Sequence, residues 1–177
     1  IQSQISQYGD YKCKIYLLHG CMTEKEINSL YTHPKLHAYI TTTHGEGFGL
    51  PMFEAAYNAM PVLAPDWSGH LDFLYMPQKT KGKKTRNKAM FSKISYTLGP
   101  VQEFAVWPGV VEPDSKWAFP ELGSIKMSME EVQKDYGRFK KQAKDLQKWV
   151  LNNFSEDHIH KLLIDSINKA VQGEDNV

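Results

Sequence analysis

Residues 37–65, HAYITTTHGEGFGLPMFEAAYNAMPVLAP, decide the fold of this chain. The stretch 37–42 is rich in β-branched and aromatic residues, which favour a strand. The glycine-rich turn 45–49 leads into a segment with Pro51 at its start, where proline suits the first turn of a helix. Residues 61–65 are apolar and bounded by prolines, so they read as another strand. The stretch therefore predicts a strand–helix–strand unit.

The residues before this stretch extend the same alternation. Residues 13–19, CKIYLLH, form a short apolar run that predicts a buried strand, and Thr23 and Glu26 form a capping box that starts a helix. Three strands and two helices within about 55 residues are typical of parallel βαβ units. The predicted fold class is α/β, a Rossmann-like parallel sheet with helices on both faces. Right-handed crossovers would bring three loops to one edge of this sheet, namely 19–23, 43–50 and 66–72.

The middle of the chain differs in composition. Residues 77–93 contain seven basic residues and no acidic ones, which predicts a mobile insertion. Residues 90–98 and 101–111 alternate in polarity and predict two short strands joined at Gly99-Pro100. A basic insertion with a short β-hairpin is therefore expected within about 77–111.

Two helices are expected after residue 127. Ser128 and Glu131 form a capping box that predicts a long helix over 129–151, with one apolar face. Ser155 is the predicted N-cap of a last helix. Its expected buried residues are Ile159, Leu162, Leu163, Ile167, Ala170 and Val171.

Length and composition limit the possible functions. The chain has 177 residues, which fits one domain, and its net charge of +1 gives no general reason to expect nucleic acid as a partner. Cys13 and Cys21 have no metal-ligand spacing, and a reduced, cytoplasmic setting is expected. No apolar run approaches the roughly 20 residues that span a bilayer. The first residue is not Met, and we expect a piece of a longer protein.

Residues 44–54, HGEGFGLPMFE, combine the groups that a phosphate attached to sugars requires. The three glycines at 45, 47 and 49 allow tight turns and close approach of the backbone to a ligand. The amides of Phe48, Gly49 and Leu50 precede a helix, where free donors and the helix dipole favour an anion. The carboxylates of Glu46 and Glu54 accept hydrogen bonds from sugar hydroxyls. Glycine-rich turns before helices are common, so the turn alone identifies no ligand.

The string from Glu46 to Glu54 is similar to the E-x7-E motif of retaining glycosyltransferases with the two-domain GT-B fold, especially family 4. The resemblance covers roughly residues 13–172. It implies that the chain is the C-terminal, donor-binding domain, with an N-terminal acceptor-binding domain as partner. It also implies a nucleoside diphosphate sugar as donor, a hydroxyl acceptor, and no metal ion or other cofactor.

The resemblance implies a role for each matching position. Glu46 would contact the donor sugar as the candidate catalytic residue, and Glu54 would bind the ribose hydroxyls. The remaining substrate-binding positions would be His44, Gly45, Gly47, Phe48, Gly49, Leu50, Cys21 and Met22, the last two beside the base.

The sequence departs from the family pattern at three places. Ser68-Gly69-His70-Leu71-Asp72 stands where many relatives have two glycines and a glutamate. The basic segment 77–93 has no counterpart. The basic side chains that neutralise the diphosphate would lie before Lys12, outside this chain.

Simpler roles stand beside these interpretations. Glu46 and Glu54 could be ordinary solvated carboxylates, and His44 could cap its loop by hydrogen bonding. A structural role is expected for His19 and His70, and Trp107 and Trp117 could be packing anchors or sugar-stacking residues. Cys21 could simply be a small packed residue. The chain could also be a nucleotide-sugar sensor or pseudoenzyme, or could use 77–93 to contact a membrane peripherally or another anionic surface.

Overall fold

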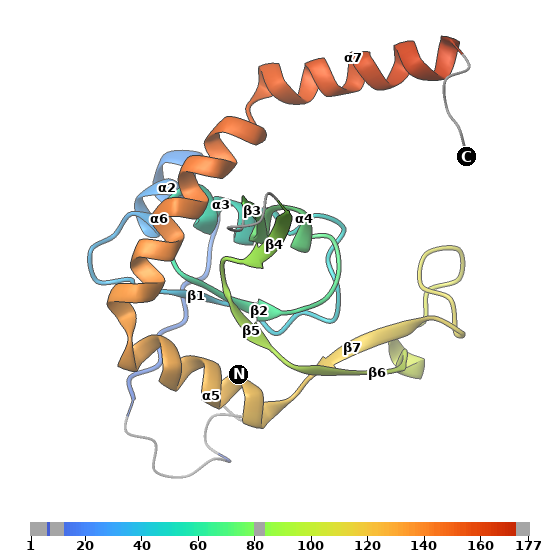
Figure 1. Cartoon of the computed structure of the whole chain (residues 1–177). Coiled ribbons are helices and arrows are strands. Elements are labelled where there is room, and N and C mark those ends of the chain that lie inside the picture. The colour runs from blue at the N-terminus through green and yellow to red at the C-terminus, as the bar shows by residue number, and fades with distance from the viewer. Residues whose placement is uncertain (1–6, 8–12, 80–83, 173–177) are drawn as a thin grey trace.

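The protein is described here from a computed structural model, which covers residues 7, 13–79 and 84–172. It is an α/β protein with a small parallel sheet at its centre (Figure 1). In chain order the elements are α2 (Glu24–Tyr31), β1 (Tyr39–Ile40), α3 (Leu50–Tyr57), β2 (Val62–Pro65), α4 (Leu71–Leu74), β3 (Tyr75–Lys79), β4 (Thr85–Ala89), β5 (Ser92–Ile94), β6 (Tyr96–Pro100), the 3₁₀ helix η2 (Glu103–Ala105), β7 (Lys116–Pro120), α5 (Leu122–Lys134), α6 (Tyr136–Asn153) and α7 (Glu156–Gln172).

The central sheet has the strand order β1-β2-β5, and both pairs are parallel. Tyr39 pairs with Val62 in the first, and Leu63 pairs with Ser92 in the second. The strands predicted at 37–42 and 61–65 are confirmed, with β1 shorter than expected. The predicted helix between them is also confirmed as α3, with Pro51 in its first turn.

Helices cover both faces of this sheet, as predicted. Val62 and Ala64 belong to a core cluster that includes residues of α3 and α6. Leu63, between them on β2, points to the opposite face because side chains alternate along a strand. There it packs with Val132 of α5 and Phe139 of α6. β2 is buried along its whole length, as expected for a central strand of a parallel sheet.

Residues 13–19 do not form the predicted strand. They have no regular secondary structure, and every one of them is exposed. β-propensity describes fit to a half-buried pleated surface, and none of the three strands of the central sheet pairs with this segment. The helix that follows begins as predicted, because Thr23 and Glu26 form the capping box of α2.

The basic segment 77–93 is not simply a mobile insertion. β3 and β4 pair antiparallel with Tyr75 opposite Ala89 and Lys79 opposite Thr85, while residues 80–83 lie outside the described part. The pair predicted between 90–98 and 101–111 is also wrong. β6 runs through Gly99-Pro100 and pairs with β7, so that Gly99 lies opposite Trp117. Alternation of polarity identifies a strand, but not its partner.

The helix predicted over 129–151 is two helices. Ser128 is not an N-cap, because α5 begins at Leu122 and the Ser128 hydroxyl donates to the carbonyl of Lys93 at 2.8 Å. Asp135 separates α5 from α6, and its side chain accepts a hydrogen bond from the amide of Arg138. The predicted apolar face is confirmed on both helices, since Val132 of α5 and Phe139 and Leu146 of α6 are buried.

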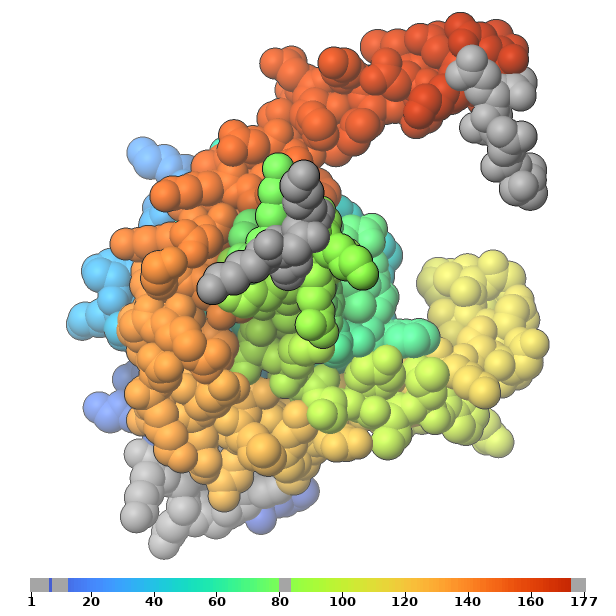
Figure 2. All heavy atoms as spheres, in the orientation of Figure 1, coloured from blue at the N-terminus to red at the C-terminus, as the bar shows by residue number. Residues whose placement is uncertain are grey.

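α7 forms where the sequence predicts it, but it does not bury its apolar face. The Ser155 hydroxyl accepts from the amide of His158 at 3.4 Å, as expected of an N-cap. The helix then projects away from the body of the molecule (Figures 1 and 2). The six residues expected to be buried are all exposed. Within the described ranges, no helix has the length and apolar character needed to cross a membrane.

Candidate functional site

Gly49 fixes the corner between the loop after β1 and helix α3. Its φ is 88°, in the left-handed region that favours glycine. A Cβ at this position would also lie 2.7 Å from Cε of Met52 and 3.1 Å from Cβ of His70. Glycine is therefore required at Gly49 both by conformation and by space.

The loop after β1 and the loop after β2 are joined into one unit by Ser68. The Ser68 hydroxyl accepts from the amide of Glu46 at 2.8 Å and donates to the carbonyl of Glu46 at 2.6 Å. The amide of Gly69 donates to the same carbonyl at 3.1 Å. Both backbone groups of Glu46 are thus held in place. A Cβ at Gly69 would collide with the carbonyl oxygen of Gly47, so the two backbones are in direct contact.

Two of the three loops predicted to converge therefore do so. The third, 19–23, directly precedes α2, and its Cys21 and Met22 are exposed. α2 in turn lines a pocket of about 310 Å³ together with α3. Glu54 of α3 and Glu24, Asn28 and Tyr31 of α2 lie on the walls of this pocket. Residues 21 and 22 thus stand at the start of the helix that faces Glu54.

Glu46 and Glu54 both affect the pKa of the Tyr39 hydroxyl. Burial raises the pKa of Tyr39, and the nearby carboxylates of both glutamates raise this pKa further. A hydrogen bond with Thr41 has the opposite effect on the Tyr39 pKa. Glu46 lies in the loop after β1, and Glu54 lies on the helix that follows this loop, so both carboxylates belong to elements that start at the carboxyl end of β1.

Glu54 also lies beside the hydroxyl of Tyr31. Burial raises the pKa of Tyr31, and the charge of Glu54 and a hydrogen bond with it raise this pKa further. The rings of Tyr31 and Tyr39 are in contact, with centroids 6.3 Å apart. Two phenols thus lie near the Glu54 carboxylate, and that of Tyr31 can donate a hydrogen bond to it.

The start of α3 presents backbone donors. Within the described part of the chain, the amides of Phe48, Gly49 and Leu50 donate to no other residue. The Phe48 side chain is not part of this surface. Its ring packs among core aromatics, 5.0 Å from Phe73 and 5.3 Å from Phe53. Phe48 can therefore contribute its amide to a ligand but not its ring.

His44 connects the loop to a distant strand. Its Nδ1 lies 2.7 Å from the carbonyl of Ala118, 74 residues along the chain. A carbonyl only accepts, so Nδ1 carries the proton. The amide of Ala118 returns a bond to the carbonyl of His44 at 3.2 Å. The His44 ring also stacks on Trp117, with centroids 4.9 Å apart and planes at 6°. His44 thus caps and anchors its loop, and only Nε2 is left for a ligand.

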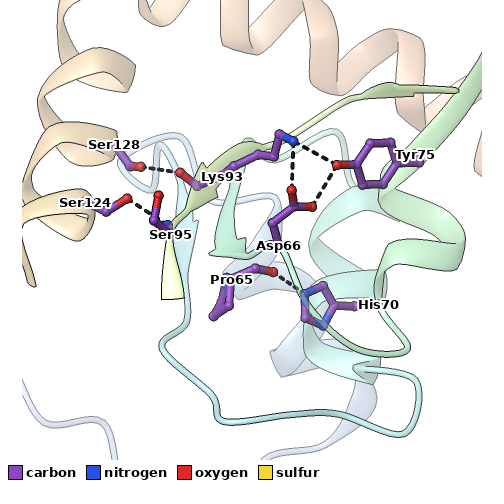
Figure 3. A network of polar contacts seen from close by, with 8 residues as sticks. All are labelled: Pro65, Asp66, His70, Tyr75, Lys93, Ser95, Ser124 and Ser128. Carbon is purple, nitrogen blue, oxygen red and sulfur yellow. Dashed lines mark hydrogen bonds and ion pairs between the residues drawn. The ribbon is translucent and has the colours of Figure 1, made fainter. Parts of the chain in front are cut away.

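His70 is enclosed behind the corner. It is fully buried, and its Nε2 donates to the carbonyl of Pro65 at 2.7 Å (Figure 3). Its Nδ1 has no hydrogen-bond partner among the described residues. This agrees with the structural role predicted for it. His19, in contrast, is exposed, and Asp72 is an exposed residue in the first turn of α4.

A polar triad that the sequence did not predict stands at the ends of β2 and β5. The Nζ of Lys93 lies 2.8 Å from the Asp66 carboxylate and 2.9 Å from the Tyr75 hydroxyl, which itself donates to Asp66 at 2.7 Å (Figure 3). The hydrogen bond to Asp66, and then that to Tyr75, raise the pKa of Lys93. The only sequence signal was an acidic residue directly after a predicted strand. Its lysine and tyrosine partners come from separate segments.

Across residues 7, 13–79 and 84–172, no group of three or more His, Cys, Asp or Glu side chains is arranged to hold a metal ion. Comparisons with protein-family models, with curated proteins and with solved structures give no match. The chemistry of the edge formed by the loops after β1 and β2 is therefore the basis for a function.

Proposed function

We propose that this chain is the donor-binding domain of a retaining glycosyltransferase, one half of a GT-B enzyme, and that it binds a nucleoside diphosphate sugar at the edge formed by the loops after β1 and β2. The observation that carries the proposal is that Glu46, the free amides at the start of α3, and Glu54 on the wall of the pocket between α2 and α3 follow one another directly after β1 of the parallel sheet. Ligands of open α/β sheets bind at this end of the strands.

Each group has a part in the proposed complex. The amides of Phe48, Gly49 and Leu50, at the positive end of the α3 dipole, would hold the diphosphate. The carboxylate of Glu54 would accept hydrogen bonds from the ribose diol, and the pocket between α2 and α3 would receive the nucleoside. Glu46 would contact the sugar, because its backbone is fixed by Ser68 and Gly69 and only its side chain remains free.

The reaction transfers the sugar with retention of configuration. The bond between the anomeric carbon and the diphosphate oxygen breaks, and its electron pair leaves with the diphosphate. A bond forms from the acceptor oxygen to the anomeric carbon on the same face, and the proton of the acceptor hydroxyl passes to the departing diphosphate oxygen. The amides stabilise the charge that develops on the leaving diphosphate. An acceptor-binding domain must close over this site to exclude water, so the chain alone should bind nucleotide weakly and transfer nothing.

A thermal-shift screen against UDP-, GDP- and ADP-sugars tests the proposal, since a ligand that binds the folded state raises the unfolding temperature. At least one donor class should stabilise the chain, and Glu54→Ala should reduce the shift. Glu156→Ala removes an exposed glutamate from the start of α7 and is the matched control. Absence of any shift, or equal shifts in both variants, would count against the proposal. A pseudoenzyme would keep the shift but, joined to its acceptor domain, would form no glycosylated product.

A second candidate function is contact with an anionic surface, as expected from 77–93. β4 lies beside α6, where the Gln142 side chain donates to the carbonyl of Ala89 at 2.8 Å. A hydrogen bond from Lys141 lowers the pKa of Asp145, and the charges of Lys148 and Lys88 add to this effect. Basic residues from two distant segments thus share one face. Binding to anionic vesicles or DNA that falls steeply with salt and is weakened by Lys88→Gln would favour this function.

A further inference from the structure

The segment from Tyr96 to Pro120 forms an arm that stands out from the body of the molecule (Figures 1 and 2). β6 and β7 make its two sides, and the bond from the amide of Val101 to the carbonyl of Ser115 at 3.2 Å extends the pairing by one step. Its base is held by the loop after β1, through the bonds between His44 and Ala118 and the stacking of His44 on Trp117. The arm is therefore attached to the same loop that carries Glu46.

The tip of the arm is a hydrogen-bonded turn that leaves two aromatic residues exposed to solvent. Trp107 pairs with Val111 through bonds of 2.9 and 2.7 Å. Gly109 takes a φ of 79°, and its amide donates to the carboxylate of Glu112 at 2.7 Å. Despite these bonds the Trp107 side chain is 66% exposed, and nearby Phe104 is 85% exposed. An exposed tryptophan on a hydrogen-bonded turn is available for contact with a partner.

The negative charge of the tip excludes some classes of partner. Residues 101–115 contain three carboxylates, from Glu103, Glu112 and Asp114, and no basic residue. This charge repels nucleic acid and anionic lipid. Carboxylates that only accept hydrogen bonds suit hydroxyl groups, and an exposed aromatic face suits the apolar face of a ring. Hydroxyl groups and an apolar ring face occur together in a carbohydrate.

We infer that the tip of the arm binds a neutral carbohydrate chain by stacking a sugar ring on Trp107. The proposal of a carbohydrate site depends only on the structure of the arm. The further proposal that this site binds the acceptor depends on the proposed glycosyltransferase function. Trp107 lies beyond the last paired residues of the arm, whereas the Glu46 loop lies at its base. An acceptor that touches both must be an extended oligosaccharide rather than a single sugar.

Titration of the chain with neutral hexasaccharides, maltohexaose, cellohexaose and mannohexaose, tests this site by calorimetry and by tryptophan fluorescence. At least one should bind, Trp107→Ala should weaken that binding by about tenfold or more, and Trp107→Tyr should restore most of it. Val171→Ala, which changes an 81% exposed apolar side chain on α7, should have no effect. Circular dichroism confirms that each variant is folded.

The outcomes separate the site from the proposed function. Hexasaccharide binding that depends on Trp107, without any nucleotide-sugar binding, would keep the carbohydrate site and remove its role as acceptor site. Nucleotide-sugar binding with no hexasaccharide binding, or with binding unchanged in Trp107→Ala, would overturn the site. Self-association that is lost in Trp107→Ala on sedimentation would also overturn it, since the tip would then bind a second copy of the chain.

Discussion

The hydroxyl of Ser68 bonds both backbone groups of Glu46, accepting from its amide at 2.8 Å and donating to its carbonyl at 2.6 Å. The position has a backbone cost, because the φ of Ser68 is 86°. The loops after β1 and β2 are thus held together by a residue in a conformation that serine rarely adopts.

Removing this hydroxyl should loosen the site. We expect Ser68→Ala to lower the free energy of unfolding by about 1–3 kcal/mol, since two partly buried hydrogen bonds are lost. Ser68→Gly loses the same bonds but relieves the left-handed backbone, so its loss should be smaller. Urea unfolding of the two variants checks the order. Equal stability of Ser68→Ala and the wild-type chain would show that the two bonds contribute nothing.

The contact between Gly69 and Gly47 leaves no room for a methyl group. Gly69→Ala would place its Cβ against a backbone carbonyl that cannot move without separating the loops. We expect a loss of about 3 kcal/mol, the upper end of the usual cost of overpacking. Gly137→Ala in α6 is the control, because its Cβ would meet no atom. That variant should gain about 0.5–1 kcal/mol from helix propensity, and denaturant unfolding measures both.

Glu54 should be required for ligand binding rather than for folding. It is exposed on α3, and its loss should remove a charge-assisted hydrogen bond to the ribose, about 1.5–3 kcal/mol of binding free energy. Calorimetry with the donor identified by thermal shift measures this, with Glu156→Ala as the control. An unchanged affinity would exclude Glu54 from the site.

The two phenols near Glu54 should make stability fall at alkaline pH. The pKa values of Tyr31 and Tyr39 are raised in the folded state, whereas an unfolded tyrosine titrates near about 10. Between these values the folded state holds more protons, so stability that is complete below about pH 10 is lost as the pH rises through the folded pKa values. Glu54→Gln should lower the pKa of Tyr31 in an ultraviolet titration of the phenols. An identical titration curve in the variant would place Glu54 too far from Tyr31 to affect it.

The proposed glycosyltransferase reaction should not depend on a divalent cation. In the proposed site, amides and a helix dipole stabilise the leaving diphosphate. Addition of a chelator to a protein that joins this domain to its acceptor-binding domain should leave product formation unchanged. A large loss of activity that added metal restores would contradict the prediction.

Sequence patterns correctly predicted the helix starts that depend on capping or proline within a few residues. The capping box at Thr23 starts α2, and Pro51 lies in the first turn of α3. Sequence patterns gave wrong predictions where a strand depends on a pairing partner elsewhere in the chain. Residues 13–19 have strand composition without a strand partner, and β6 pairs with β7 rather than with 101–111. Spacing within one segment cannot show which distant backbone will supply the hydrogen bonds.

The candidate site divides in the same way. The motif from Glu46 to Glu54 could be found by reading along the chain, because its glycines and carboxylates lie within one turn and one helix. The roles of Ser68 and Ala118 could not be found in this way. Ser68 lies 22 residues from its partner Glu46, and Ala118 lies 74 residues from its partner His44. The pairing of Lys93 with Asp66 likewise joins residues 27 apart.

By itself the sequence determined the α/β class, the strand–helix–strand unit around 37–65 and the helix starts at Thr23 and Ser155, because propensity, capping and turn chemistry act over a few residues. Only the tertiary structure decided that Ser68 holds the backbone of Glu46, that His44 contacts the arm, and that the apolar face of α7 stays exposed. These depend on which surfaces meet after the chain has closed on itself, and contact between distant segments leaves no local pattern.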